Sequence, residues 1–373
     1  MNHRERVLAA MRHEPLDRVP TVMWATVEVQ EMLFDHFGIE AGRGVPPNGV
    51  GLFGGALSRD TRAIAELWDR LSSDGILGLV PPYIGPPLRE EGGIVYSEWG
   101  FGSRIQQYDR GQYFEQVVFP LAEAETIADL EAYPWPDPDW YDYDALREIA
   151  RQCEGRAIGG GYTAPFYYHN MLRGLEQSLM DPLVKPEFTH CLVQHISDFF
   201  TEYHRRLFDA VGDLIDVTQV TDDFGSQYGL MISPKMFDDF YRKPMQRGID
   251  LAKENDIVVF HHDDGDCRSL LPTFVEMGVE VLNPIQWRCG EWDLAALKRD
   301  FGEHLCFHSA IDNQQTLPFG SPDQVRSEVK MLIETLANDG TGLIIGPCHN
   351  LQIVSPVENI VALYEAAQEY GSL

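Results

Sequence analysis

Residues 256–267 read DIVVFHHDDGDC, an apolar run that changes abruptly into titratable and metal-ligating residues. Its first half has the β-branched and aromatic residues typical of a buried strand. The same change recurs later in the chain, in VEVLNPIQ at 279–286, HLCFHSAID at 304–312 and GLIIGPCHN at 342–350. Strands that end in this way predict a parallel sheet whose reactive groups gather at one edge.

The pattern extends over most of the chain. Eight strands are expected, at 19–24, 75–80, 156–161, 214–220, 256–262, 279–284, 304–309 and 342–348. Segments with helical spacing follow the later strands, at 234–255, 268–277, 294–301, 323–338 and 357–370. This alternation predicts the α/β class and a (β/α)8 TIM barrel that forms one domain over residues 1–373.

The part before residue 156 is less regular and predicts an elaborated N-terminal half. Residues 81–140 are expected to be an insertion that contains a β-hairpin, with strands near 94–99 and 104–108. The alternative is that residues 1 to about 140 fold as a separate domain, since boundaries are the least secure part of such a reading.

The composition excludes several classes of function. Lys and Arg total 29 against 58 for Asp and Glu, a net charge of −29, which disfavours partners with phosphate backbones or anionic membranes. We therefore expect a small-molecule substrate and neither nucleic acid nor membrane as a partner. The sequence shows no long apolar stretch and no signal-peptide core, which predicts a cytoplasmic protein. A monomer and a homodimer both stay open.

The carboxyl ends of barrel strands share one rim, so the polar residues that follow them are expected to form a single site. We expect Asp223 and His349 to transfer protons, and His308 to be either a third catalytic group or a buried core histidine. The residues expected to bind substrate are Tyr162, Asp222, Gln227, Asn283, Gln286 and Asn350.

Asp222 and Asp223 are adjacent, so their side chains leave the strand in opposite directions. Asp223 is expected to face the pocket while its neighbour caps a loop or helix. The alternative is that both carboxylates cap the helix after Gly225, because Asp is a favoured cap.

His262, Asp264 and Cys348 are the candidate metal ligands. Imidazole, carboxylate and thiolate all bind zinc, and a catalytic zinc site needs three protein ligands and one open position. The competing interpretation of Cys348 is a buried core thiol, the commonest environment of a single cysteine.

Several segments resemble the uroporphyrinogen decarboxylase superfamily. They are RERVLAAMRHEPLDRVP at 4–20, EWGFGSR at 98–104, MLRGLEQSL at 171–179, TDDFGSQYGLMISPKMFDDFYRKP at 221–244, VVFHHDDGD at 258–266 and PCHNLQIVSPVENIVALYEAAQEYG at 347–371. The resemblance implies a (β/α)8 barrel with its site at the carboxyl-terminal mouth. It also implies one of two activities: decarboxylation of a tetrapyrrole, or methyl transfer between a small compound and a corrinoid protein.

One departure from the family favours the second activity. The tetrapyrrole decarboxylases carry an N-terminal RQAGRY-like segment whose arginines bind substrate carboxylates, whereas the comparable region here, TVMWATVEVQEML at 21–33, has no arginine. The methyltransferase branch uses a His-x-Cys pair and a later Cys to bind zinc. His262 and Cys348 match that pattern, and Asp264 replaces the middle Cys.

The expectation is a zinc-assisted transfer of methyl from a small methoxylated or N-methylated compound to a corrinoid carried by a partner protein. Two alternatives stay open. One is a metal-independent decarboxylase of a small acid or tetrapyrrole-like substrate, with Asp223 and His349 handling protons. The other is a binding protein that has kept the barrel and lost its chemistry.

Overall fold

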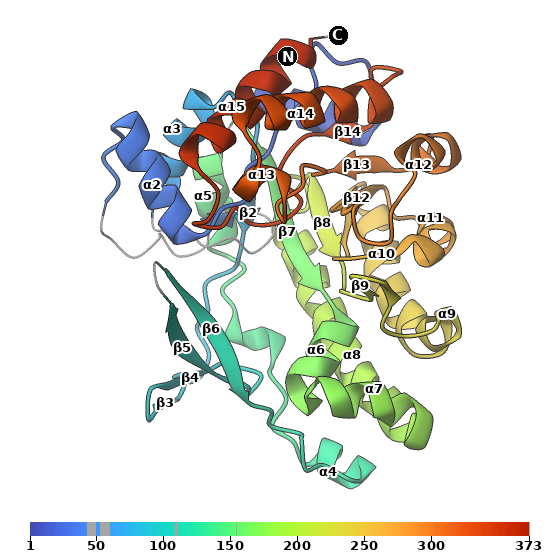
Figure 1. Cartoon of the computed structure of the whole chain (residues 1–373). Helices are drawn as coiled ribbons and strands as arrows, with labels where there is room; N and C mark the ends of the chain where they lie inside the picture. The colour runs from blue at the N-terminus through green and yellow to red at the C-terminus, as the bar shows by residue number, and fades with distance from the viewer. Residues whose placement is uncertain (43–49, 53–59, 109–110, 154, 373) are drawn as a thin grey trace.

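Seven parallel strands form the centre of the computed structural model, which describes residues 1–42, 50–52, 60–108, 111–153 and 155–372 (Figure 1). In order across the sheet, they are β2 (Ile76–Leu79), β7 (Ala157–Thr163), β8 (Val217–Val220), β11 (Val258–His262), β12 (Val281–Asn283), β13 (Cys306–His308) and β14 (Leu343–Ile344). The short β1 (Val50–Leu52) pairs antiparallel with β2. The sheet is curled, which gives the α/β, TIM-barrel-like fold that the sequence predicts.

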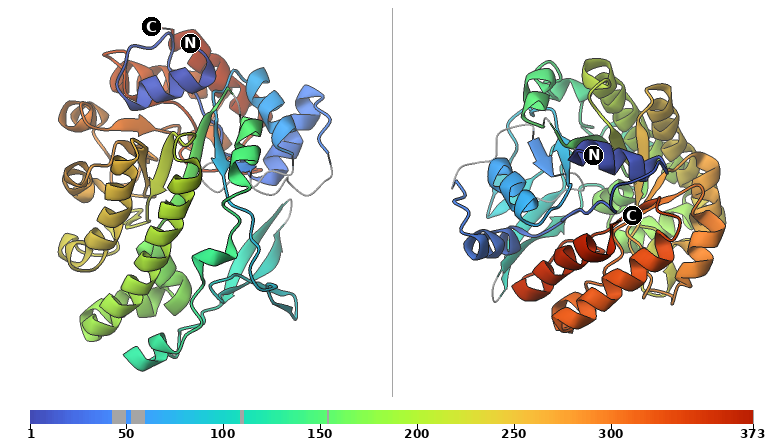
Figure 2. Two further views of the ribbon diagram at one scale, coloured as in Figure 1. Left: turned by 180° about the vertical axis from the view of Figure 1, so that it is seen from behind. Right: turned by 90° about the horizontal axis from the view of Figure 1, so that it is seen from above.

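The helices of the described residues are α1 (His3–Met11), α2 (Val27–Phe37), α3 (Thr61–Arg70), α4 (Ile127–Glu131), α5 (Leu146–Ala150), α6 (Pro165–Arg173), α7 (Leu175–Val184), α8 (Pro186–Val211), α9 (Pro234–Met236), α10 (Arg242–Glu254), α11 (Leu271–Met277), α12 (Leu294–Phe301), α13 (Thr316–Phe319), α14 (Pro322–Leu336) and α15 (Val357–Tyr370). Most of them cover the outside of the curled sheet (Figure 2), whereas α1 lies across one end of it and α4 lies away from it (Figure 1). Among the described helices, none is long and apolar enough to cross a membrane.

The first expected strand, at 19–24, is not a regular strand, and this prediction was wrong. Residues in it make only isolated bridges, such as Thr21 with Ile345. Pro20 has no N–H to donate, and the carbonyl of Thr21 accepts from the N–H of Asp74 instead of from β14. The segment therefore lies between β14 and the residues that precede β2, and it forms a few backbone hydrogen bonds with each of them.

A separate four-stranded antiparallel sheet lies within the region expected as an insertion. Its strands are β3 (Glu90–Glu91), β4 (Ile94–Tyr96), β5 (Gly102–Tyr108) and β6 (Gly111–Val118), paired in that order. Residues 109–110 of the region lie outside the described residues. β4 and β5 fall where two hairpin strands were expected, whereas β3 and β6 were not predicted. The sheet projects past the carboxyl ends of the barrel strands (Figure 1).

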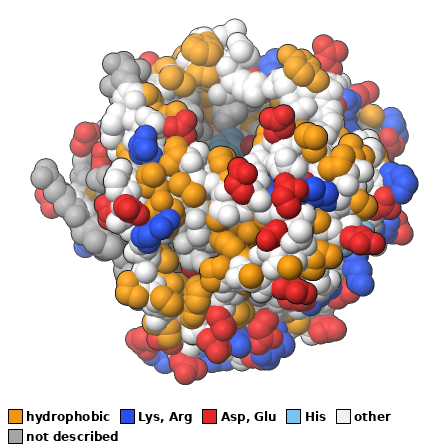
Figure 3. All heavy atoms as spheres, turned by 90° about the horizontal axis from the view of Figure 1, so that it is seen from below, with side chains coloured by type: hydrophobic (Ala, Val, Ile, Leu, Met, Phe, Trp, Pro, Cys, Tyr) orange, Lys and Arg blue, Asp and Glu red, His pale blue; other side chains and the backbone are white. Residues whose placement is uncertain are grey.

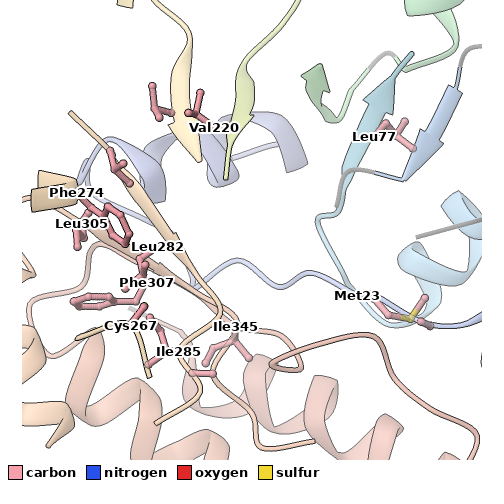
Figure 4. Close-up of a cluster of buried hydrophobic side chains, with 14 of the residues drawn as sticks. Met23, Leu77, Val220, Cys267, Phe274, Leu282, Ile285, Leu305, Phe307 and Ile345 are labelled. Atoms are coloured by element: carbon pink, nitrogen blue, oxygen red, sulfur yellow. The ribbon is translucent and has the colours of Figure 1, made fainter. Parts of the chain in front are cut away.

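The barrel interior is filled by side chains from all seven parallel strands, with two from β11. These buried residues are Ile76, Ala157, Val217, Val258, Phe260, Val281, Cys306 and Ile344. Helix α1 covers the amino-terminal end of the barrel with Val7, Ala10 and Met11. A larger core lies between the strands and the outer helices, and Figure 4 shows part of it, with Leu282 and Phe307 from neighbouring strands. The amino-terminal end of the barrel is thus filled with apolar side chains, and the polar side chains lie at the carboxyl-terminal end.

Candidate active site

The mouth of the barrel is the face shown in Figure 3, where histidine atoms lie in a hollow beside acidic side chains. Three neighbouring strands end there on polar residues: β11 on His262, β12 on Asn283 and β13 on His308. His262 and Asn283 are paired in register. The parallel arrangement therefore brings side chains from distant parts of the chain to one place, as the sequence predicts.

His262, Asp264 and His349 form a group able to hold a metal ion. One ligand atom from each lies within 4.8 Å of the other two. His262 Nε2 is 3.8 Å from Asp264 Oδ1, and His349 Nε2 is 3.6 Å from Asp264 Oδ2. These separations are too long for hydrogen bonds and close to the ~3.4 Å between two ligands of tetrahedral zinc, given bonds of about 2.0–2.1 Å. The donor set and its spacing fit a zinc ion.

Asn283 fixes the tautomer of His262. Its Nδ2 donates to the carbonyl oxygen of His308 at 3.2 Å, which sets the orientation of the amide. The amide oxygen then faces Nδ1 of His262 at 2.6 Å, so this nitrogen carries the proton. The lone pair of His262 is left on Nε2, the atom that faces the two carboxylates. Amide or carboxylate partners of this kind orient metal-binding histidines.

Burial and neighbouring charges have opposite effects on the pKa values of His262, Asp264 and His349. Burial opposes protonation of His262, but the nearby Asp223 and Asp264 carboxylates outweigh it and raise its pKa. Burial lowers the pKa of His349, with Asp264 acting in the opposite direction. Burial also raises the pKa of Asp264, while the two histidines act to lower it. The three side chains form one interacting set of acid and base groups.

The carboxyl group of Asp223 and the amide group of Gln286 hold these three side chains in place. Asp223, whose side chain is 45% exposed, lies 3.6 Å from His262 Nε2 and accepts the backbone N–H of Asp264 at 3.0 Å. Gln286 donates to Asp264 Oδ1 at 2.6 Å and accepts from the N–H of Gly265 at 2.7 Å. Asp223 therefore faces the mouth as expected, and Gln286, expected to bind substrate, orients Asp264.

Asp222 has a different position from the one expected of a substrate-binding residue. It is 2% exposed and accepts the backbone N–H groups of Phe166 and Tyr167, at 2.9 and 2.6 Å, at the start of α6. Burial raises its pKa well above the usual range, although these two hydrogen bonds act to lower it. Asp222 thus caps α6, in agreement with the expectation that the neighbour of Asp223 caps a loop or helix and not with the alternative that both carboxylates cap a helix after Gly225.

His308 is a buried core histidine, the second of its two expected roles. Burial lowers its pKa to about 3, so the ring is neutral. It lies against Phe260 and Trp24, with ring centroids 5.0 and 5.9 Å away, and Asn283 Nδ2 donates to its Nδ1 at 2.8 Å. It supports Asn283 from behind the mouth.

The structure also differs from the prediction for Cys348. Among the described residues, the metal-competent group contains His349 and not Cys348. The Cys348 thiol is buried and lies 3.4 Å from the carbonyl oxygen of Ile285, as expected of a core thiol. His349, which was expected to transfer protons, thus lies where Cys348 was expected as a metal ligand.

The remaining predicted residues lie around the mouth. Tyr162 lines a cavity beside it, and Gln227 is exposed, with its amide oxygen 3.4 Å from Gln314 Nε2. The side-chain oxygen of Asn350 is buried without a hydrogen-bond partner in the described part of the chain. Trp24, which sequence reasoning missed, packs on His262 with ring centroids 5.8 Å apart. Only its position in the region expected as the first strand pointed to it.

Polar side chains gathered at the carboxyl ends of the strands are typical of enzymes with a barrel of this kind. The chain belongs to the uroporphyrinogen decarboxylase (URO-D) family, whose model matches residues 99–370. Curated relatives include uroporphyrinogen decarboxylases from Aliivibrio salmonicida, 22% identical over 280 residues (69% of this chain, 74% of the relative), and Pseudomonas fluorescens Pf-5, 24% identical over 284 residues (70% and 74%).

Among solved structures, a methyltransferase from Methanosarcina mazei is similar, with a TM-score of 0.65, 19% sequence identity and 99% of each chain covered. At this identity the likeness shows the shared fold. The family supports an enzyme, and the activity is inferred from the site.

Proposed function

We propose that the chain is a methyltransferase that moves methyl from a small methoxylated or N-methylated compound to a corrinoid carried by a partner protein, with a zinc ion held by His262, Asp264 and His349. The observation that carries the proposal is the spacing of these three ligand atoms. When bound, zinc supplies Lewis acidity to the oxygen or nitrogen that carries the methyl group. A ligand set without thiolate suits such harder atoms better than sulfur.

The side chains around the ion have separate tasks. Asn283 keeps the Nε2 lone pair of His262 available, and Gln286 holds Asp264 in its orientation. The Asp223 carboxylate, 3.6 Å from His262 Nε2, is placed to accept a proton or to hold a cationic substrate. A reduced corrinoid on the partner protein would supply the acceptor for the methyl group, and the electron pair of the broken bond between methyl carbon and heteroatom would stay with the heteroatom.

The test is metal content combined with activity. After incubation with zinc and dialysis, the wild type should retain about one zinc ion per chain, and His262→Ala, Asp264→Ala and His349→Ala should each lose it. Cys348→Ala should keep it, and so should the control Cys289→Ala, a thiol that lines the same small pocket as Cys348. Methyl transfer to cob(I)alamin, assayed on methoxyaromatics and methylamines, should stop on chelation and return with zinc.

Two results would contradict the proposal. Absence of zinc from the wild type under these conditions would remove the metal. Loss of zinc in Cys348→Ala with retention in His349→Ala would restore the ligand set expected from the sequence.

A metal-independent carboxy-lyase is the second candidate, because the curated relatives are named uroporphyrinogen decarboxylases. Asp223 and His349 would then handle protons. This activity would survive chelation, which separates it from the first candidate.

A further inference from the structure

A cavity of about 310 Å³ lies at the mouth on the side of β2 and β7. Its walls are largely aromatic and come from distant parts of the chain. Trp99 follows β4, Tyr141 follows the short helix η1 (Pro138–Trp140), Tyr168 lies on α6, and Phe200 and Tyr203 lie on α8. One carboxylate, Glu98, also lines the cavity.

The aromatic walls are held by contacts with one another. The ring of Trp99 lies 4.6 Å from that of Tyr168 and 5.5 Å from that of Phe200, measured between centroids. The rings of Tyr141 and Tyr203 meet edge to face at 5.1 Å. Because each ring is fixed by its neighbours, the cavity is formed before any ligand enters, which lowers the entropic cost of binding.

The polar groups of the cavity are only partly satisfied. The hydroxyl of Tyr141 donates to Glu98 Oε1 at 2.9 Å. Among the described residues, Glu98 makes no ion pair, and no hydrogen bond is formed by the hydroxyls of Tyr168 and Tyr203. None of the residues lining the cavity is Lys, Arg or His. The cavity therefore has a negative carboxylate and electron-rich rings but no balancing cation.

This combination selects the charge of the ligand. An anion would meet Glu98 and a chain of net charge −29. A neutral apolar ligand would remove water from the carboxylate without replacing its interactions, which is costly. A cation with methyl groups on its nitrogen would contact the faces of the rings with its apolar surface and offset the charge of Glu98, as in aromatic cages that bind quaternary ammonium groups.

The cavity reaches the strand next to the one that leads into the candidate active site. Tyr162 lines it and pairs with Gln219 of β8, and Thr163 pairs with Val220, the last residue of β8. Asp223 lies three residues after Val220, and its charge adds to the effects of burial, Tyr168, Asp222 and Tyr167 that raise the pKa of Tyr162. The Asp223 carboxylate thus acts on a residue of the cavity wall.

We infer that this cavity binds the alkylated ammonium group of a cationic substrate, in a cage formed by Tyr141, Tyr168, Phe200, Tyr203 and Glu98, with the buried Trp99 packed against Tyr168 and Phe200. The inference rests on the proposed function only in placing the reacting end of that substrate at His262, Asp264 and His349. Recognition of the cation itself requires no metal.

The test compares two probes of equal shape. Choline and its neutral carbon isostere 3,3-dimethylbutan-1-ol are titrated into the full chain after chelation, and binding is followed by calorimetry and by tryptophan fluorescence. Choline should bind about tenfold or more tightly than the isostere. Glu98→Gln should remove that preference, and the control Glu91→Gln, an exposed carboxylate on β3, should keep it.

Equal affinity for the two probes, a preference that survives in folded Glu98→Gln, or no saturable binding of choline in the millimolar range would overturn the inference. The comparison of probes on the wild type decides the matter even where Glu98→Gln fails to fold. Because the metal is absent throughout, a negative result here leaves the zinc proposal standing, and loss of the zinc proposal leaves the cage to be tested on its own.

Discussion

Asn283 has the most specific role of any single residue near the candidate metal group, because its amide sets which nitrogen of His262 is free. Asn283→Leu keeps the approximate size and removes the side-chain hydrogen bonds to His262 and His308. We expect zinc affinity, measured by competition with a chromogenic chelator, to fall by about 10- to 100-fold. The fold should persist, because the amide lies at the mouth and not in the filled end of the barrel.

Asn359→Leu is the matched control for this change. Asn359 is also buried and donates to two backbone carbonyl oxygens, of Leu317 and Gly320, at 2.9 and 2.8 Å. Its replacement should lower stability and leave zinc affinity unchanged. Equal zinc affinity in Asn283→Leu and the wild type would show that the tautomer of His262 is set by something else.

The sequence predicts the position of His262 at the mouth because it is the last residue of a regular strand, where alternation and position are both defined. The choice between Cys348 and His349 could not be made in this way. β14 ends at Ile344, four residues before Cys348, so the pleat no longer determines which side chain faces the mouth. Asp222 was misplaced for a related reason, because its hydrogen-bond partners on α6 are more than fifty residues away.

At the scale of the element, β7 is shaped by a bulge. Its register with β8 shifts between Gly159 and Tyr162, and Gly161 has a φ of +90°. A Cβ on Gly161 would overlap the His204 ring and lie 2.7 Å from Thr218 Oγ1. Gly161→Ala should therefore lower the free energy of unfolding by about 3 kcal/mol in urea denaturation. It should also weaken binding in the cavity, since Tyr162 follows directly.

Gly155→Ala provides the comparison. Gly155 has a similar φ of +86°, but an added Cβ there has no neighbour within 4 Å. This change should cost only the backbone strain of the left-handed region, about 1 kcal/mol. Similar losses in the two variants would mean that the packing of His204 against β7 adds nothing to the strain.

The elements that the sequence predicts well are those with a repeating pattern. The expected helices at 294–301 and 357–370 match α12 and α15, and the helix expected from residue 323 is α14, which begins at Pro322 with Ser321 as its N-cap. The bulge in β7 and the segment at 19–24 have no repeating pattern to reveal them, because each depends on hydrogen bonds to distant residues such as Ile345.

At the scale of the whole molecule, Asp74 joins the N-terminal part to the barrel. Its fully buried carboxylate pairs with Arg6 Nη1 at 2.6 Å and Arg18 Nη1 at 2.9 Å and accepts the N–H of Thr21 at 3.0 Å. Asp74→Asn removes the carboxylate partner of Arg18 and one of the two partners of Arg6, which keeps Asp17. It should lower the free energy of unfolding by about 3 kcal/mol at neutral pH.

The pH dependence of this effect has a definite sign. Burial acts to raise the pKa of Asp74, but the hydrogen bond with His3 and the charges of Arg18 and Arg6 outweigh it, so the pKa is lowered in the folded chain. The stabilisation is present above the unfolded pKa of about 3.9 and is lost as the pH falls below it. The stability difference between wild type and Asp74→Asn should therefore shrink below about pH 4.

Asp213→Asn, which breaks an exposed pair with Arg147, should cost much less at neutral pH. A difference between wild type and Asp74→Asn that stays constant down to pH 3 would show that the Asp74 carboxylate does not titrate as its environment requires.

The two ends of the chain meet on the face away from the mouth. The N–H of Val19 donates to the carbonyl oxygen of Gly371 at 2.8 Å, Arg18 bridges to Ser372, and both termini lie at the same end of the molecule in Figures 1 and 2. A fluorophore or affinity handle attached to either end would thus point away from the opening. Docking of a corrinoid carrier could be followed with such labels while the entrance stays clear.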